Sequence, residues 1–174
     1  MGEAGDPKPW IDPRQFDLIV SSLPDDGTLV EWGSGGSTIE LRRRKPNASI
    51  LSFETDPEWA QITSAMYVEP DPDPPNRRLG PMHDSVYGLH RYIHEPPIGL
   101  ADVILIDGFA RSACLLRCVV EKVPGTIWFH DSDEEAYRWM IGNLLTLGLI
   151  VETAYDPTPD YSPHTRLSRI HVRR

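Results

Sequence analysis

Polar residues that could bind a ligand or move a proton stand at the ends of four apolar segments of the sequence. These residues are Glu31, Glu54, Asp107 and the neighbours His130 and Asp131. If the four segments are parallel strands of one sheet, their carboxyl ends meet at the edge where open α/β sheets bind ligands. Carboxylates accept hydrogen bonds from hydroxyl or ammonium groups, and an imidazole titrates near neutral pH. The sequence therefore predicts one site that combines ligand binding with acid–base chemistry.

A glycine-rich turn follows the first of these segments, and it carries Gly33 and Gly35. The residues from Ser37 to Glu40 form a capping box, which predicts that a helix begins there. Strand, glycine turn and helix N-terminus in this order are typical of a nucleotide-binding βα unit. The two glycines permit a tight turn and a close approach of the backbone to a ligand. A tight strand–helix turn without a ligand remains the alternative interpretation.

The spacing around this turn bears on which nucleotide is bound. The dinucleotide fingerprint needs a glycine at its sixth position, and counting from Gly33 that position is Thr38. The fingerprint is therefore incomplete, which weakens the interpretation as an NAD-linked oxidoreductase. Glu54 stands 21 residues after Gly33, a separation at which an acidic residue can hold ribose hydroxyls.

The arrangement Glu31-x-Gly33-x-Gly35 resembles the first motif of class I S-adenosylmethionine-dependent methyltransferases. In that family the acid lies near the amino acid end of the cofactor, the glycines pass under it, and a second acid, here Glu54, binds the ribose. The resemblance thus implies an S-adenosylmethionine site made by Glu31, Gly33, Ser34, Gly35, Glu54 and Asp107.

Methyl transfer from a sulfonium is a direct displacement, which needs an aligned acceptor and often a base. We expect the catalytic residues to be His130, Asp107 and Asp131, with His130 as the candidate base. The alternative for His130 is a capping or core-edge histidine. Arg111, at the start of a predicted helix, could pair with a substrate carboxylate or form a structural salt bridge to Asp107 or Glu134.

Asp107 and Asp131 could together bind a divalent cation such as Mg²⁺, because two carboxylates suit ions that prefer oxygen ligands. Cation-dependent O-methyltransferases of the catechol type carry acids at these two strand ends. Ser132 stands where that family has an amide, so the sequence departs from the family's metal motif at this position.

The pattern of elements predicts one α/β domain over residues 1–174. Asp12-Pro13 and Asp56-Pro57 each predict a helix start, and a second capping box begins at Ser132. The segments 149–155 and 166–172 alternate like strands with no helix between them, so they should be antiparallel neighbours. We predict a Rossmann-like three-layer sandwich whose mostly parallel sheet ends in this antiparallel pair, which resembles the class I methyltransferase sheet. The proline-rich stretch 67–97 is expected to be a long loop that carries part of the substrate site.

Composition narrows the classes of partner. With 17 basic and 26 acidic residues the formal charge is −9, which argues against a general nucleic-acid binder. No apolar run is long enough to span a membrane, and the polar N-terminus does not resemble a secretory signal. Cys114 and Cys118 lie four residues apart in a predicted helix, and we expect buried thiols in a reducing compartment, by default the cytoplasm.

The sequence therefore predicts an S-adenosylmethionine-dependent methyltransferase that methylates an oxygen of a small molecule or sugar. The segment Phe129–Glu134 resembles polysaccharide O-methyltransferases of the glucuronoxylan type, and the Asp107-Gly108 strand end is similar to small bacterial methyltransferase-like proteins. A methyltransferase-like binding or scaffold domain without turnover is the alternative, and an NAD-linked oxidoreductase is a weaker one. The sequence gives no prediction of the oligomeric state.

Overall fold

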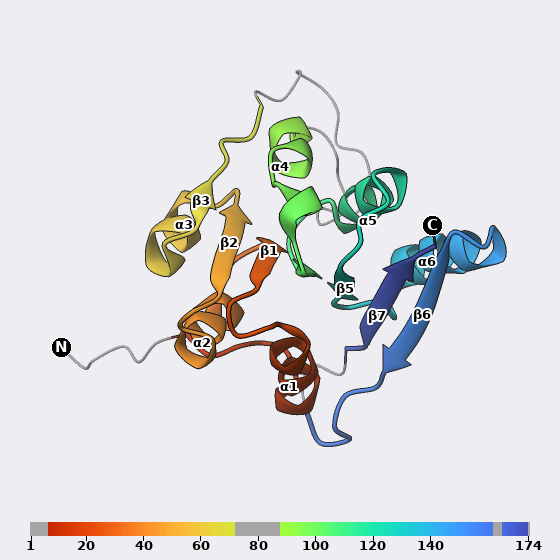
Figure 1. The fold of residues 1–174 in the computed structure, drawn as a ribbon, viewed down its shortest axis with the longest axis horizontal. Coiled ribbons are helices and arrows are strands. Elements are labelled where there is room, and N and C mark those ends of the chain that lie inside the picture. The colour runs from red at the N-terminus through yellow and green to blue at the C-terminus, as the bar shows by residue number, and fades with distance from the viewer. Residues whose placement is uncertain (1–6, 72–87, 162–164, 174) are drawn as a thin grey trace.

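The computed structural model describes residues 7–71, 88–161 and 165–173, and the part of the predicted loop at residues 72–87 lies outside the described residues. Seven strands form one sheet with helices packed against it (Figure 1). The elements are α1 (Pro13–Ser22), β1 (Thr28–Trp32), α2 (Gly36–Arg44), β2 (Ser49–Glu54), α3 (Pro57–Thr63), β3 (Met66–Tyr67), α4 (His90–His94), the 3-10 helix η1 (Ile98–Leu100), β4 (Val103–Ile106), α5 (Arg111–Val120), β5 (Thr126–Phe129), α6 (Glu135–Thr146), β6 (Ile150–Tyr155) and β7 (Leu167–Val172).

The order of the strands in the sheet is β3-β2-β1-β4-β5-β7-β6. Strands β1 to β5 pair in parallel, whereas β7 runs antiparallel to both of its neighbours, β5 and β6. The predicted fold class is therefore confirmed, including the terminal antiparallel pair. The chain places β7 inside the sheet and leaves β6 at its edge.

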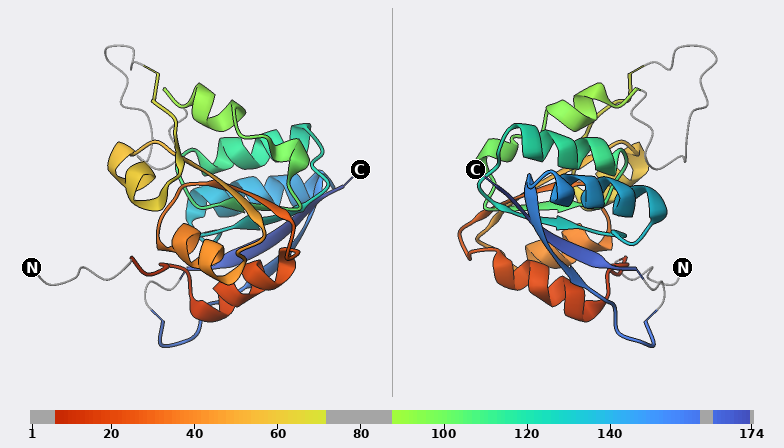
Figure 2. Two further views of the ribbon diagram at one scale, coloured as in Figure 1. Left: turned by 60° about the vertical axis from the view of Figure 1, so that its left-hand side comes forward. Right: turned by 90° about the vertical axis from the view of Figure 1, so that its right-hand side faces the viewer.

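Two hydrophobic clusters lie on opposite faces of the sheet, which makes three layers. Along β4, Val103 and Leu105 face a cluster that includes Phe16 and Ile19 of α1. Ile104 and Ile106 alternate with them and face a cluster that includes residues of α4, α5 and α6. Figure 2 shows α1 and α2 on one side of the sheet and α4, α5 and α6 on the other. The continuous apolar run of β4 is thus explained by burial on both faces.

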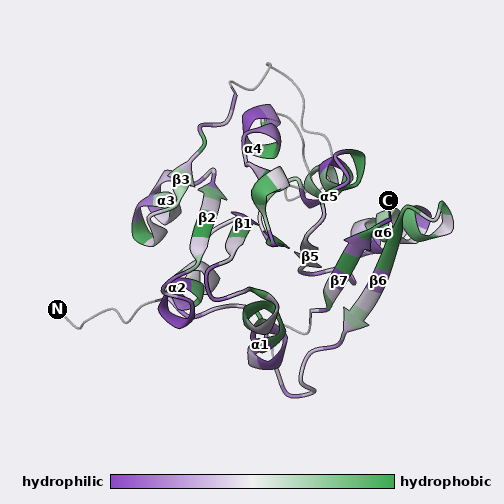
Figure 3. Ribbon diagram, viewed as in Figure 1, coloured by the Kyte–Doolittle hydropathy of each residue, from purple (hydrophilic) through white to green (hydrophobic). Residues whose placement is uncertain are grey.

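Helix α1 has both an N-terminal cap and an apolar face that packs against the sheet. Asp12 caps it by accepting hydrogen bonds from the backbone N–H groups of Arg14 (2.8 Å) and Gln15 (3.3 Å), and Pro13 takes the first helical position. Its hydrophobic side faces the sheet and its hydrophilic side faces outward (Figure 3). Asp56 caps α3 in the same way. Both predicted helix starts are confirmed.

The two predicted capping boxes are wrong. Helix α2 begins at Gly36 with Gly35 as its cap, and the hydroxyl of Ser37 is directed toward Glu31 instead. Helix α6 begins at Glu135, and the hydroxyl of Ser132 donates to the carbonyl of Arg166, 3.2 Å away. In both cases the serine finds a partner in another element, so it does not cap the helix that follows it.

The stretch 67–97 differs from the predicted loop where the structure describes it. Helix α4 lies in this stretch and buries Tyr92 and Ile93. The indole N–H of Trp32 donates to the carbonyl of Tyr92 over 2.9 Å, which ties α4 to the end of β1. Sequence periodicity did not reveal this helix because it has only five residues.

The remaining sequence predictions concern thiols and membranes. The thiols of Cys114 and Cys118 are both buried on α5, as predicted. Within the described parts of the chain, no helix combines the length and the apolar character needed to cross a bilayer.

Candidate functional site

A cavity of about 550 Å³ lies over the carboxyl ends of β1, β2, β4 and β5. It brings together all but one of the residues predicted for the site: Gly33, Ser34, Gly35, Glu54, Asp107, His130 and Asp131. Glu31 is the exception, because its side chain does not line the cavity.

Glu31 is fully buried behind the glycine turn. Its carboxylate accepts hydrogen bonds from the hydroxyls of Ser37 (3.3 Å), Thr38 (2.7 Å) and Ser52 (2.7 Å). Burial raises the pKa of Glu31 to about 7, although these three hydroxyls favour the charged form. The hydrogen bonds that this strand-end acid accepts therefore come from hydroxyls of the protein itself. Its assignment to the cofactor site stays a prediction.

The glycines of the turn serve different purposes. Gly33 has a φ of 88°, and a Cβ there would lie 2.5 Å from the Cα of Gly108, so Gly33 allows the loops after β1 and β4 to touch. A Cβ on Gly35 would meet no atom within 4 Å. Because Gly35 lines the cavity, its missing side chain leaves that space open to a ligand.

Glu54 lies at the wall of the cavity with only 6% of its surface exposed. Its carboxylate accepts hydrogen bonds from the backbone N–H groups of Ser34 (2.7 Å), Thr55 (2.7 Å) and Asp56 (3.0 Å). These donors fix the carboxylate in place. The hydroxyls of Ser34 (3.2 Å) and Thr55 (3.5 Å) also donate to it, so a hydroxyl group of a ligand would take the place of one of these side-chain donors.

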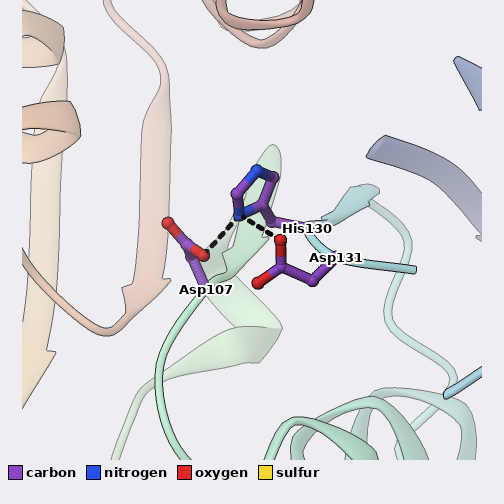
Figure 4. Close-up of side chains that lie close together, drawn as sticks. All are labelled: Asp107, His130 and Asp131. Atoms are coloured by element: carbon purple, nitrogen blue, oxygen red, sulfur yellow. Dashed lines mark hydrogen bonds and ion pairs between the residues drawn. The ribbon is translucent and has the colours of Figure 1, made fainter. Parts of the chain in front are cut away.

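The ends of β4 and β5 hold a second group of charges, drawn in Figure 4. His130 Nδ1 lies 2.8 Å from Asp107 Oδ1 and 3.4 Å from Asp131 Oδ1. The other ring nitrogen, Nε2, lies 3.1 Å from the hydroxyl of Thr165, which precedes β7. His130 is only 4% exposed. The imidazole thus has a partner at each nitrogen.

Electrostatics favours the charged forms of this histidine–aspartate pair. Burial lowers the pKa of His130, but the charge and hydrogen bond of Asp107, with the charge of Asp131, raise it above its ordinary value overall. Burial likewise raises the pKa of Asp107, but His130 and Arg111 bring it below its ordinary value. Each partner thus favours the charged form of the other.

Arg111, the first residue of α5, lies beside the same carboxylates. Its Nη1 is 2.5 Å from Asp131 Oδ2, and its Nη2 is 3.4 Å from Asp107 Oδ1, so the salt bridge to Asp107 considered from the sequence is present. Its Nε donates to the carbonyl of Gly108 (2.9 Å) and its Nη1 to that of His130 (3.0 Å). Asp131 has a φ of 56°, which non-glycine residues rarely adopt, and its carboxylate pairs with Arg111.

Sequence reasoning missed several residues of the site. Lys8 and Trp10 line the cavity from the segment before α1, although nothing in their local sequence marks them. A Cβ on Gly36 would lie 2.2 Å from the carbonyl carbon of Lys8, so Gly36 is the signal that a second backbone passes there. Thr165 was also missed, because only the tertiary fold brings it to His130.

Solved structures with this fold were found by comparison. An O-methyltransferase from Bacillus cereus in complex with SAH aligns with a TM-score of 0.59 at 15% identity, over 94% of this chain and 82% of that one. The chain has the fold of class I S-adenosylmethionine-dependent methyltransferases. The shared fold places the cavity of this chain at the ligand-binding edge of the sheet.

Two further methyltransferase structures align over nearly the whole chain. A methyltransferase-like protein from Silicibacter pomeroyi has a TM-score of 0.56 at 19% identity, over 96% of this chain and 89% of that one. Precorrin-6y C5,15-methyltransferase from Geobacter metallireducens has a TM-score of 0.53 at 16% identity, over 96% and 98%. Comparisons of the sequence with family models and with curated proteins give no match.

Proposed function

We propose that this protein is an S-adenosylmethionine-dependent methyltransferase that acts on an oxygen of a small molecule or sugar. The observation that carries the proposal is the anchored carboxylate of Glu54, which lines a cavity also bordered by the open side of Gly35. A buried acceptor at this strand end suits the two hydroxyls of an adenosine ribose. The methyltransferase fold and an SAH complex of one structural neighbour add support.

The residues of the turn have separate tasks in this proposal. Glu54 accepts the ribose hydroxyls, while Gly33, Ser34 and Gly35 form the wall beside the amino acid end of the cofactor. Glu31 acts from behind this wall by holding Thr38. When bound, the cofactor supplies an electrophilic methyl group. The cavity residues hold the acceptor in line with that group, which is the main requirement of a direct displacement.

The base in this proposal is His130, oriented by Asp107 and Asp131. In the neutral imidazole, Nδ1–H donates to Asp107 and leaves a lone pair on Nε2. An acceptor hydroxyl that takes the place of the Thr165 hydroxyl would give its proton to this nitrogen, while the bound cofactor would supply the methyl group and leave as the neutral thioether.

Calorimetric titration with S-adenosylmethionine and S-adenosylhomocysteine tests the cofactor site. We expect both to bind, and Glu54→Gln to weaken binding by roughly 10- to 100-fold, since a hydrogen bond to a charged acceptor contributes about 1.5–3 kcal/mol. Glu58→Gln is the matched control, because Glu58 is an exposed acid on α3 that does not line the cavity. A folded wild-type protein that binds neither compound would refute the proposal.

A second candidate function is a cofactor-binding domain without turnover. It is favoured by the near-complete burial of His130 and the partner at each of its ring nitrogens. Single-turnover measurements with a panel of phenolic and sugar hydroxyl acceptors separate the two candidates. Methyl transfer to any of them selects the enzyme, whereas tight donor binding with no transfer across the panel selects the binding domain.

The weaker alternative, an NAD-linked oxidoreductase, is tested by competition. We expect nicotinamide dinucleotides not to displace S-adenosylhomocysteine, because Thr38 stands at the position of the third fingerprint glycine. Binding of the dinucleotide more tightly than of S-adenosylmethionine would select the oxidoreductase.

A further inference from the structure

Asp107, His130 and Asp131 form the kind of group that binds metal ions. Each offers a ligand atom, and these atoms lie within 4.8 Å of one another. Two carboxylates and an imidazole are a common donor set for divalent cations. The composition of the group alone therefore indicates a cation site, and Figure 4 shows the three side chains converging.

The surroundings of the group do not fit a divalent cation, because Arg111 already supplies a cation there. Its guanidinium contacts Asp131 Oδ2 at 2.5 Å and Asp107 Oδ1 at 3.4 Å. His130 Nδ1 contacts Asp107 Oδ1 at 2.8 Å and Asp131 Oδ1 at 3.4 Å. Three of the four carboxylate oxygens thus have a positively charged or proton-donating neighbour. A divalent ion bound to the same oxygens would be repelled by the guanidinium.

Arg111 cannot turn away from the carboxylates without breaking further hydrogen bonds. It donates to the backbone carbonyls of Asp107, Gly108 and His130, at 3.2, 2.9 and 3.0 Å. Its side chain is 12% exposed, and its guanidinium lies 5.8 Å from the centre of the Tyr137 ring. A guanidinium stays charged at any relevant pH and presents its donors in a rigid fork, so it is a permanent occupant.

We propose that Arg111 is the resident cation of the Asp107–Asp131 carboxylate pair, and that it and a divalent metal ion are mutually exclusive occupants. The site therefore works without a metal, and removing the guanidinium converts the group into a divalent cation site. Arg111 is a positioning residue in this role, because it holds the two carboxylates and the ends of β4 and β5. The inference concerns these side chains alone and does not depend on the methyl donor.

Manganese binding, measured by the loss of the free Mn²⁺ electron paramagnetic resonance signal, tests this directly. Wild-type protein is expected to bind no Mn²⁺ at this group, and its melting temperature is expected to be the same in MnCl₂ and in EDTA. Arg111→Ala is expected to gain at least about tenfold in Mn²⁺ affinity, with a melting temperature that rises with Mn²⁺ concentration.

Arg117→Ala is the matched control. Arg117 lies on the same helix with a side chain only 10% exposed, pairs with Glu121 at 2.7 Å and donates to the carbonyl of Ile93. Its removal costs fewer contacts but of the same kinds, to an acid, a backbone carbonyl and an aromatic ring, so a general effect of losing a buried arginine on α5 would appear in both variants. Only Arg111→Ala should gain Mn²⁺.

Two results would overturn the proposal. One is Mn²⁺ binding by the wild type that Asp131→Asn abolishes. The other is a folded Arg111→Ala with no gain in Mn²⁺ affinity. Arg111→Gln is the second variant if the alanine variant does not fold, because the glutamine amide can still donate to a strand-end carbonyl. It should show the same gain in Mn²⁺ affinity. Titration of the wild type with S-adenosylmethionine tests the proposed function separately. The hypothesis of a cofactor site and the hypothesis that Arg111 excludes a metal ion can therefore fail independently.

Discussion

The hydroxyl of Thr38 joins the glycine turn to the end of β1. It accepts a hydrogen bond from the backbone N–H of Gly35 (3.1 Å) and donates to Glu31 Oε2 (2.7 Å). This explains why the position that holds a glycine in dinucleotide-binding turns holds a threonine here. The turn is closed by side-chain hydroxyls that meet on one buried carboxylate.

Thr38→Val tests this connection, since valine keeps the shape of threonine but has no hydroxyl. It removes one donor from Glu31 and one acceptor from Gly35 at a position with no exposed surface. We expect the free energy of unfolding to fall by about 1–3 kcal/mol in urea titrations. Thr146→Val is the control, because the Thr146 hydroxyl is exposed and bonds only a carbonyl of its own helix. An equal effect of the two substitutions would contradict the role of Thr38.

The buried carboxyl of Glu31 should make stability depend on pH. Its pKa is about 7 in the folded protein against an ordinary value of 4.5, so between these values the unfolded chain loses a proton that the folded protein keeps. Stability should therefore fall as the pH rises from about 4.5 to 7, by about 3 kcal/mol from this group. We expect Glu31→Gln to lack this part of the pH dependence in urea titrations at pH 5 and 8. Identical pH profiles for both proteins would contradict it.

The His130–Asp107 pair predicts a different pH window. Because the pKa of His130 is raised in the folded protein, its stabilising contribution is full below about 6.5 and is lost as pH rises through the folded value. Methyl transfer, which needs the neutral imidazole, should rise over the same range. Asp107→Asn should lower the pKa of His130, which NMR titration of the ring protons measures, with His130→Asn to assign the signal. An unchanged pKa in Asp107→Asn would exclude this pairing.

At the scale of the elements, the three glycines around the start of α2 each lack a side chain for a different reason. Gly33 gives room to the loop after β4, Gly36 gives room to the segment before α1, and Gly35 gives room only to the cavity. Gly35 has a φ of −176°, which is extended backbone that any residue adopts. A small side chain at position 35 would therefore strain neither the backbone nor the packing of the protein.

Gly35→Ala should leave the fold intact and block the ligand. The added methyl meets no protein atom within 4 Å but enters the cavity at the N-terminus of α2, so we expect calorimetry to show at least about tenfold weaker binding of S-adenosylhomocysteine. Gly142→Ala in α6 is the control. It also has open space, and it should only stabilise the helix by about 0.5–1 kcal/mol. Unchanged cofactor affinity in Gly35→Ala would place the cofactor elsewhere.

At the scale of the whole molecule, the position of β7 depends on how much of each strand can be buried. Leu167 and Ile170 of β7 belong to the two different hydrophobic clusters, so β7 is covered on both faces. Strand β6 has one buried residue, Ile150, and accordingly lies at the edge. The sequence predicted the antiparallel pair, but both segments alternate, and their alternation does not show which one enters the sheet.

The sequence by itself determined the features that depend on neighbouring residues. Asp12 and Asp56 marked helix starts, the apolar runs marked strands, and the residues at the strand ends marked the edge where Glu54, Asp107 and His130 meet, because each signal acts within a few residues. Only the tertiary structure decided which partner each polar group takes. It turned Ser37 toward Glu31, brought Thr165 to His130 and set Arg111 between two carboxylates. Those partners lie in separate elements, and a hydrogen bond between elements forms only where folding sets the distance between them.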